Sequence, residues 1–72
     1  MKQGLSSKRK IVRTLEAGIV LEKDIVFPAR LSASFVLGGW SRIANNKKEF
    51  RELLKTGLEL SPISEVLIKW KE

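Results

Sequence analysis

Cysteine, histidine and tyrosine are all missing from this sequence of 72 residues. Without cysteine the chain forms no disulfide, and without cysteine or histidine it lacks the usual zinc ligands. The commonest general base is histidine, and the usual serine or cysteine nucleophiles depend on it or on cysteine itself. We therefore expect no enzyme activity, no cofactor and no metal.

Long apolar runs are missing as well. The longest, such as residues 34–40, fall far short of the roughly 20 residues that a membrane-spanning helix needs. The basic N-terminus is not followed by the apolar segment that a signal peptide requires. We expect no membrane partner and a cytoplasmic location.

Acidic residues are absent from two long segments. The chain has 14 Lys and Arg against 8 Asp and Glu, a net charge of +6, yet residues 1–13 and 25–48 contain no acid at all. Such segments are typical of solvated surfaces that keep a small protein soluble, and also of surfaces that neutralise phosphates. The second acid-free segment favours phosphate binding.

Helix-capping signals in the first half of the chain predict a mainly α fold, a small bundle of about four short helices. Ser6 and Ser7 are suitable N-caps for a first helix over residues 7–17 that ends at Gly18. Pro28 suits the first turn of an apolar helix over residues 29–37. We predict a flexible basic N-terminus over residues 1–6 and a single helical domain over residues 7–72.

The clearest helix signals lie in the second half. Asn46 and Glu49 form a capping box before a helix that we expect to close at Gly57. Ser61 and Pro62 begin the last predicted helix. Apolar residues recur at helical spacing in both: Phe50, Leu53 and Leu54 in the first, and Ile63, Val66, Leu67 and Trp70 in the second.

Residues 19–27 are ambiguous. Two apolar triplets flank the charged triplet Glu22-Lys23-Asp24, which is compatible with a short β-hairpin, a single helical turn or an extended connector. The charged triplet lacks the Asn-Gly or Asp-Gly of a tight two-residue turn. We favour the extended connector and keep the hairpin as an option.

Gly38 and the segments around it suit a helix-turn-helix or winged-helix-like arrangement. Such a motif needs a glycine turn followed by a polar helix for the major groove, and residues 41–48 are polar and basic. Gly39 and the capping signal at Asn46 count against it. A packed Gly-Gly turn followed by a solvated loop is the simpler interpretation.

The preferred functional hypothesis is a DNA-binding regulator or accessory factor, with DNA favoured over RNA. Lysine and arginine position a protein on phosphates, whereas arginine and asparagine read base edges. The predicted phosphate contacts are Lys8, Arg9, Lys10, Arg13, Lys47 and Lys48, and the predicted base readers are Arg42, Asn45 and Asn46.

The alternative hypothesis is a protein-interaction module: an adaptor, an inhibitor or an assembly factor. It would use Trp40 and exposed apolar helix faces, and a homodimer would serve the same purpose. An exposed Trp40 could stack on a base or anchor an interface. A buried Trp40 is the commonest outcome in a small domain.

Overall fold

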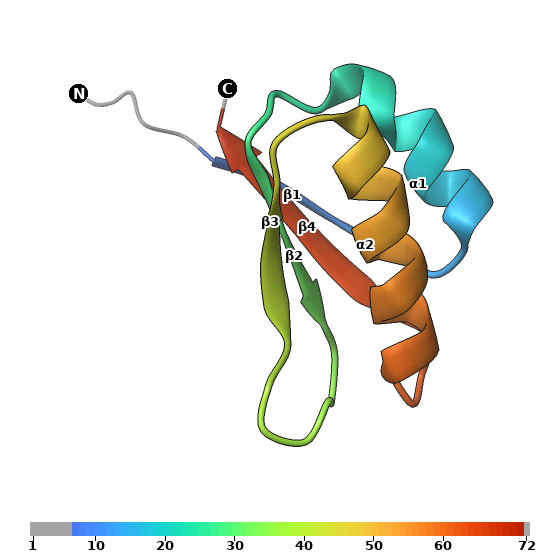
Figure 1. Ribbon diagram of the computed structural model, residues 1–72. Coiled ribbons are helices and arrows are strands. Elements are labelled where there is room, and N and C mark those ends of the chain that lie inside the picture. The colour runs from blue at the N-terminus through green and yellow to red at the C-terminus, as the bar shows by residue number, and fades with distance from the viewer. Residues whose placement is uncertain (1–6, 72) are drawn as a thin grey trace.

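The computed structural model describes residues 7–71, which form an α/β fold with four strands and two α-helices (Figure 1). In chain order the elements are β1 (Ser7–Val12), α1 (Leu15–Leu21), the short 3-10 helix η1 (Glu22–Asp24), β2 (Ala29–Ala33), β3 (Ser41–Ala44), α2 (Lys47–Leu60) and β4 (Val66–Lys71).

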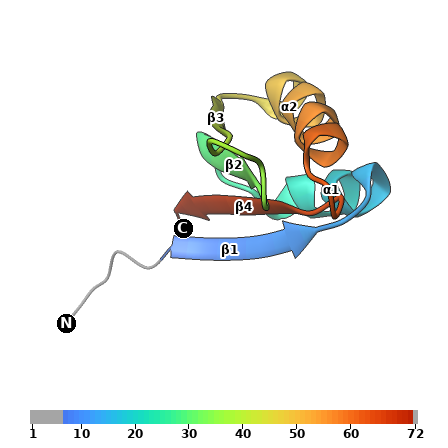
Figure 2. The ribbon, with the colours of Figure 1, turned by 90° about the horizontal axis from the view of Figure 1, so that it is seen from below.

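The four strands form one antiparallel sheet in the order β1-β4-β2-β3. The last strand of the chain therefore lies between the first and the second, and β1 and β3 are the edges. Both helices pack on the same side of the sheet (Figure 2). The opposite side, which we call the outer face, is covered by no helix or strand among residues 7–71.

The core lies between the sheet and α2. Alternate residues of each strand point to the helix side, as the pleat requires, and Leu31, Val66 and Ile68 are completely buried there. Phe50 and Leu54 of α2 are completely buried against them. Phe27 adds an edge-on contact to Phe50, with the ring centroids 6.1 Å apart.

The prediction of a mainly α bundle is wrong. The segments predicted as helices over residues 7–17 and 29–37 contain β1 and β2, and the last predicted helix is replaced by β4. In β2 and β4 the buried residues alternate with more exposed ones, which satisfies a sheet with one covered face. Pairing with distant strands therefore overrides the local capping signals.

The prediction of a helix after Asn46 is confirmed. The Asn46 side chain accepts a hydrogen bond from the Glu49 amide at 2.9 Å, and the Glu49 carboxylate accepts from the Asn45 amide at 2.9 Å rather than from Asn46. The predicted end at Gly57 is wrong, because α2 continues to Leu60. Gly57 is buried inside the helix.

The segment 19–27 forms neither a hairpin nor one extended connector. It contains the end of α1 and the helix η1, and it leads to a cis peptide bond between Phe27 and Pro28. Glu22 is buried there and accepts hydrogen bonds from Arg51 at 2.6 and 2.9 Å. These hydrogen bonds lower the pKa of Glu22, against the opposing effect of its burial.

Two further predictions concern the ends of the chain and its relation to membranes. The flexible terminus predicted for residues 1–6 lies outside the described residues, and the domain limits 7–72 stay a prediction. Within residues 7–71, neither helix has the length and apolar character to cross a membrane.

Candidate functional site

The strands β2 and β3 are joined by a glycine hairpin, residues 34–40. The Gly39 amide donates to the Val36 carbonyl at 2.9 Å, closing a turn in which Gly38 has φ of +82°. This is the position of a type II turn that requires a positive φ. Phe35 and Leu37 are exposed on the same hairpin, so its tip projects away from the core.

The base of the hairpin is fixed by a polar cluster. The Ser34 hydroxyl donates to the Glu65 carboxylate at 3.3 Å, and the Ser34 carbonyl accepts from the buried Ser61 hydroxyl at 2.8 Å. Arg13 forms an ion pair with the same carboxylate at 2.9 Å. These contacts tie the hairpin to the loop that precedes β4.

The outer face carries a row of cations across three strands. Arg9 of β1 lies opposite Lys69 of β4, and Lys69 lies opposite Arg30 of β2. Residues directly opposite one another in an antiparallel sheet share a face and have Cα atoms about 5 Å apart. All three side chains are exposed. We call Arg9, Lys69 and Arg30 the cationic row.

The cationic row contains no compensating acid. The strand residues that share the outer face with it are Ile11, Ser32, Ser41, Ile43, Leu67 and Lys71, as their register and alternation show. Like charges directly opposite one another destabilise a sheet. The outer face therefore has a positive potential that an anion would relieve.

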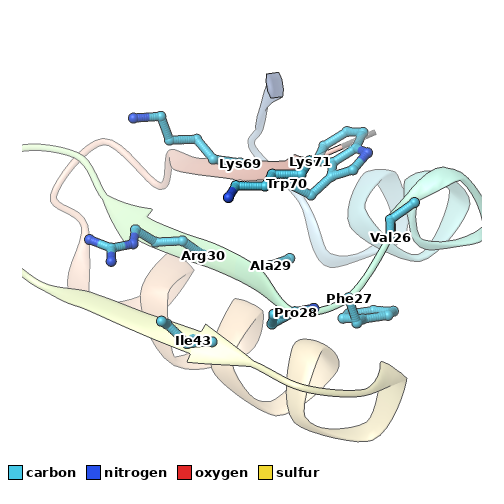
Figure 3. A pocket seen from close by; sticks show the side chains of 9 residues that line it. All are labelled: Val26, Phe27, Pro28, Ala29, Arg30, Ile43, Lys69, Trp70 and Lys71. Atoms are coloured by element: carbon cyan, nitrogen blue, oxygen red, sulfur yellow. The ribbon is translucent and has the colours of Figure 1, made fainter. Parts of the chain in front are cut away.

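A pocket of about 520 Å³ opens beside the cationic row (Figure 3). It is lined by residues from the β2 entry, β3 and β4: Val26, Phe27, Pro28, Ala29, Arg30, Ile43, Lys69, Trp70 and Lys71. Its cations are Arg30, Lys69 and Lys71, and no acid lines it. The pocket thus combines a basic wall with apolar surface.

The predicted N-terminal phosphate contacts lie on β1 or just after it, and not on the helix predicted over residues 7–17. Arg9 belongs to the cationic row, whereas Lys8 and Lys10 take the helix-side positions of β1 opposite Trp70 and Ile68. Arg13 follows the strand and pairs with Glu65. The binding of a ligand by these four residues stays a prediction.

The other predicted site residues lie on β3 and at the start of α2. The Arg42 guanidinium lies 5.5 Å from the centre of the Trp40 ring, and Trp40 is half-buried against the core. Asn45 and Asn46 bond to Glu49 at the helix start. The next two residues, Lys47 and Lys48, are exposed in the first turn of α2.

The structure therefore does not gather the predicted residues into one site. The cations that it does bring together at the pocket, Arg30, Lys69 and Lys71, were not among the predicted contacts. The signal that could have found them is the alternation of Val66, Ile68 and Trp70 with Lys69 and Lys71, which is typical of a strand with one basic face. A helical interpretation of this segment hid it.

A metal centre is not formed by the described residues. Among residues 7–71 no group of three or more Asp and Glu side chains is close enough to hold a metal ion.

Comparison with known proteins finds one family and a set of similar chains. The family described as "Carbamoyl-phosphate synthase L chain, ATP binding domain" matches residues 2–71. A carbamoyl phosphate synthase large chain from Xylella fastidiosa is 41% identical over 71 residues, covering 90% of this chain and 7% of its own length.

Two further relatives also align with most of this chain over only a small part of their own length. The N-terminal section of the large chain from Aquifex aeolicus is 47% identical over 68 residues, and the large chain from Helicobacter pylori is 51% identical over 55 residues. These alignments cover 86% and 68% of this chain but only 12% and 5% of the relatives. This chain is therefore much shorter than the curated relatives that it matches.

These similarities overturn the functional hypotheses drawn from composition. The matching family is an ATP-binding domain and its relatives are chains of a synthase, so a DNA-binding regulator with a nucleic-acid partner is wrong. The alternative of a protein-interaction module is not the function that the family indicates. The expectation of no enzyme is overturned too, because the family and the relatives that match are those of a synthase. Absent cysteine and histidine exclude only the chemistry that needs them.

Proposed function

The chain belongs to the family of the carbamoyl-phosphate synthase L chain, ATP binding domain, and on this premise we propose that the outer face of its sheet binds the phosphates of ATP. The observation that carries the proposal is the acid-free cationic row beside the pocket. Arg30 and Lys69 belong to both features.

The spacing of the cations suits a polyphosphate. Side chains from adjacent strands, about 5 Å apart at the Cα atoms, can contact neighbouring phosphate groups of one chain. Arg30 offers a planar fork of donors for two phosphate oxygens, and Lys69 offers a compact charge that bonds in any direction. Lys71 adds a third cation at the pocket.

The pocket also has room and surface for the rest of the nucleotide. Its volume of about 520 Å³ falls in the ordinary range for small-molecule sites, which are mostly apolar with a few polar groups that set orientation. Val26, Pro28 and Ile43 supply apolar lining. We assign the base to this apolar side and the phosphates to the cations.

For this chain we propose ATP binding and not the complete synthase reaction. The relatives named for carbamoyl phosphate synthesis are far longer, since this chain covers 7% of the Xylella fastidiosa protein. The complete synthase reaction is proposed only for such a full-length protein. We also propose that this chain is located in the cytoplasm.

The test compares ligands that differ in phosphate number. Isothermal titration with ATP, ADP, AMP and adenosine should give an affinity that rises with each phosphate and falls as salt is added, because the attraction is mainly electrostatic. Equal binding of ATP and adenosine, or no binding of ATP at low salt, would contradict the proposal.

Matched charge reversals locate the site. Lys69→Glu and Arg30→Glu should each weaken ATP binding by about tenfold or more, the effect of losing roughly 1.4 kcal/mol of charge-assisted contact. Lys55→Glu makes the same change in net charge on an exposed position of α2, and it should leave affinity within about twofold, or roughly 0.4 kcal/mol. Equal losses in all three variants would point to net charge alone.

A further inference from the structure

The strand β1 has one edge that no described strand pairs with. It is the first strand in the sheet order, with β4 on its inner side. Figure 2 shows β1 at the rim of the sheet, with no element of residues 7–71 beyond it. Such an edge presents a row of backbone N–H and C=O groups that can pair with another extended chain.

A groove lies next to this edge. Its volume is about 370 Å³, and it is lined by Lys10, Ile11 and Val12 of β1, by Ala17, Val20 and Leu21 of α1, and by Asp24. Ile11 is 55% exposed and Val20 is 66% exposed. A strand edge beside an apolar groove walled by a helix is the arrangement used for strand addition, where backbone bonds give affinity and the groove takes alternate side chains.

The charge of β1 indicates which kind of peptide chain can pair with this edge of the sheet. Residues 7–13 contain no acid, and Arg9 and Lys10 are exposed on β1. The one acid at the groove, Asp24, belongs to η1 rather than to the strand. A second copy of β1 paired with this edge would oppose cation to cation, which is unfavourable.

We propose that the edge of β1 and the adjoining groove bind an extended acidic peptide in which acidic residues alternate with apolar ones. The peptide adds a fifth strand to the sheet beside β1. Its apolar side chains point to the helix side and enter the groove beside Val20, and its carboxylates lie on the outer face near Arg9. The groove shares no lining residue with the pocket proposed for ATP.

The direct test uses a fluorescein-labelled peptide of the same length as β1 that alternates glutamate and valine. Fluorescence anisotropy should show saturable binding at low salt that weakens as salt is added. A peptide that alternates lysine and valine should not bind. Equal binding of both peptides, or binding of neither, would overturn the proposal.

Backbone pairing is tested on the peptide, so that the fold of the protein is untouched. Two versions carry N-methyl groups on alternate residues, one in each frame. Only one frame of N–H groups faces the partner in a ladder, so one version should lose binding and the other should keep it. Retention of binding by both versions would overturn strand addition.

The groove is tested with exposed residues, whose replacement leaves the core intact. Val20→Asp and Arg9→Glu should each weaken binding by about tenfold, or roughly 1.4 kcal/mol. Ile63→Asp is the matched control for Val20, because Ile63 is 47% exposed in the loop before β4. Unchanged affinity in Val20→Asp, or equal losses in Ile63→Asp, would overturn the proposal.

Two further measurements distinguish peptide binding from ATP binding and from pairing with a second copy of the chain. Arg30→Glu, which should weaken ATP binding, should leave peptide binding within about twofold, so failure of one proposal does not imply failure of the other. Sedimentation should show a monomer. A dimer that the peptide dissociates would mean that the edge pairs with a second copy, and would overturn the acidic occupant.

Discussion

Gly57 shows how one residue type is required by packing rather than by backbone conformation. It lies inside α2, where alanine would be favoured by about 1 kcal/mol. A Cβ at this position, however, would lie 2.9 Å from Val66 Cγ2 and 3.0 Å from Trp40 Cζ3. Both distances are shorter than ordinary van der Waals contacts, and Val66 is completely buried while Trp40 packs against the core, so an added methyl group would force its neighbours to shift.

We therefore expect Gly57→Ala to destabilise the fold. Overpacking costs about 1–3 kcal/mol, and after the gain in helix propensity a net loss on the order of 1 kcal/mol should remain. Urea denaturation followed by far-UV circular dichroism measures it. Lys55→Ala, on an exposed position of the same helix, should stay within about 0.5 kcal/mol. A more stable Gly57→Ala would contradict this account.

Glu22 makes stability depend on pH. Its pKa is lowered in the folded chain by hydrogen bonds from Arg51, so folding favours the ionised form. The stabilisation is therefore complete above the pKa of an unfolded glutamate and is lost as the pH falls through the lowered folded pKa. Glu22→Gln should be less stable than the parent chain at pH 7.

The measurement for Glu22 is a set of urea denaturation curves between neutral and acidic pH. The difference between the parent chain and Glu22→Gln should shrink as the pH falls below the folded pKa, because the carboxyl group is then neutral in both states. Glu59→Gln, at an exposed position, serves as the control and should show little difference at any pH. A difference for Glu22→Gln that is constant with pH would rule out the linkage.

At the scale of elements, the glycine hairpin is defined by backbone conformation. Gly38 and Gly39 have φ of +82° and +80°, and a Cβ on either would meet nothing within 4 Å. Gly38→Ala should therefore cost about 1–2 kcal/mol through the left-handed backbone alone. Gly38→Asn should cost less, because asparagine tolerates this region. Thermal denaturation ranks the variants, and equal losses would point to a cause other than backbone strain.

The elements differ in how far the sequence predicts them. α2 could be predicted because its signals are local: Asn46 caps the helix and apolar residues follow at helical spacing. β4 could not, because Ile63, Val66, Leu67 and Trp70 fit the helical period while Val66, Ile68 and Trp70 fit the strand period. Only pairing with β1 and β2, which are distant in sequence, decides between the two.

Whether the candidate site is recognised also depends on the choice between a helix and a strand for residues 66–71. Interpreted as a helix, residues 66–71 scatter Lys69 and Lys71 around the axis. As a strand they place both lysines on the outer face, with Lys69 beside Arg30. The acid-free segments 1–13 and 25–48 contain Arg9 and Arg30 but neither Lys69 nor Lys71, and composition does not distinguish the phosphates of a nucleic acid from those of a nucleotide.

At the scale of the whole molecule, one face of the sheet forms the core and the other carries the cationic row that we propose for phosphates. Both helices pack on one side of the sheet, where the core is formed, and the other side carries the cationic row (Figure 2). Opposed like charges cost stability, and bound phosphates would recover it. ATP should therefore raise the melting temperature by mass action.

Lys69 is the residue at which the stability of the sheet and the binding of phosphates conflict most directly, because it lies between two cations. Lys69→Glu converts two like-charge pairs, with Arg9 and Arg30, into opposite-charge pairs. Cross-strand pairs contribute about 0.2–1 kcal/mol each, so without ligand the variant should be more stable than the parent chain by on the order of 0.5 kcal/mol. It should lose the stabilisation by ATP.

Melting curves with and without ATP, at low and at high salt, test this conflict. At 1 M salt the Debye length is about 3 Å, so the gain of Lys69→Glu without ligand should largely disappear. Lys55→Glu changes the net charge equally but lies on α2, and it should keep the response to ATP. A Lys69→Glu variant that is less stable than the parent chain at low salt would mean that the cationic row is not strained. The idea that the unliganded chain is held below its maximal stability by an anion site would then fail, whatever its affinity for ATP.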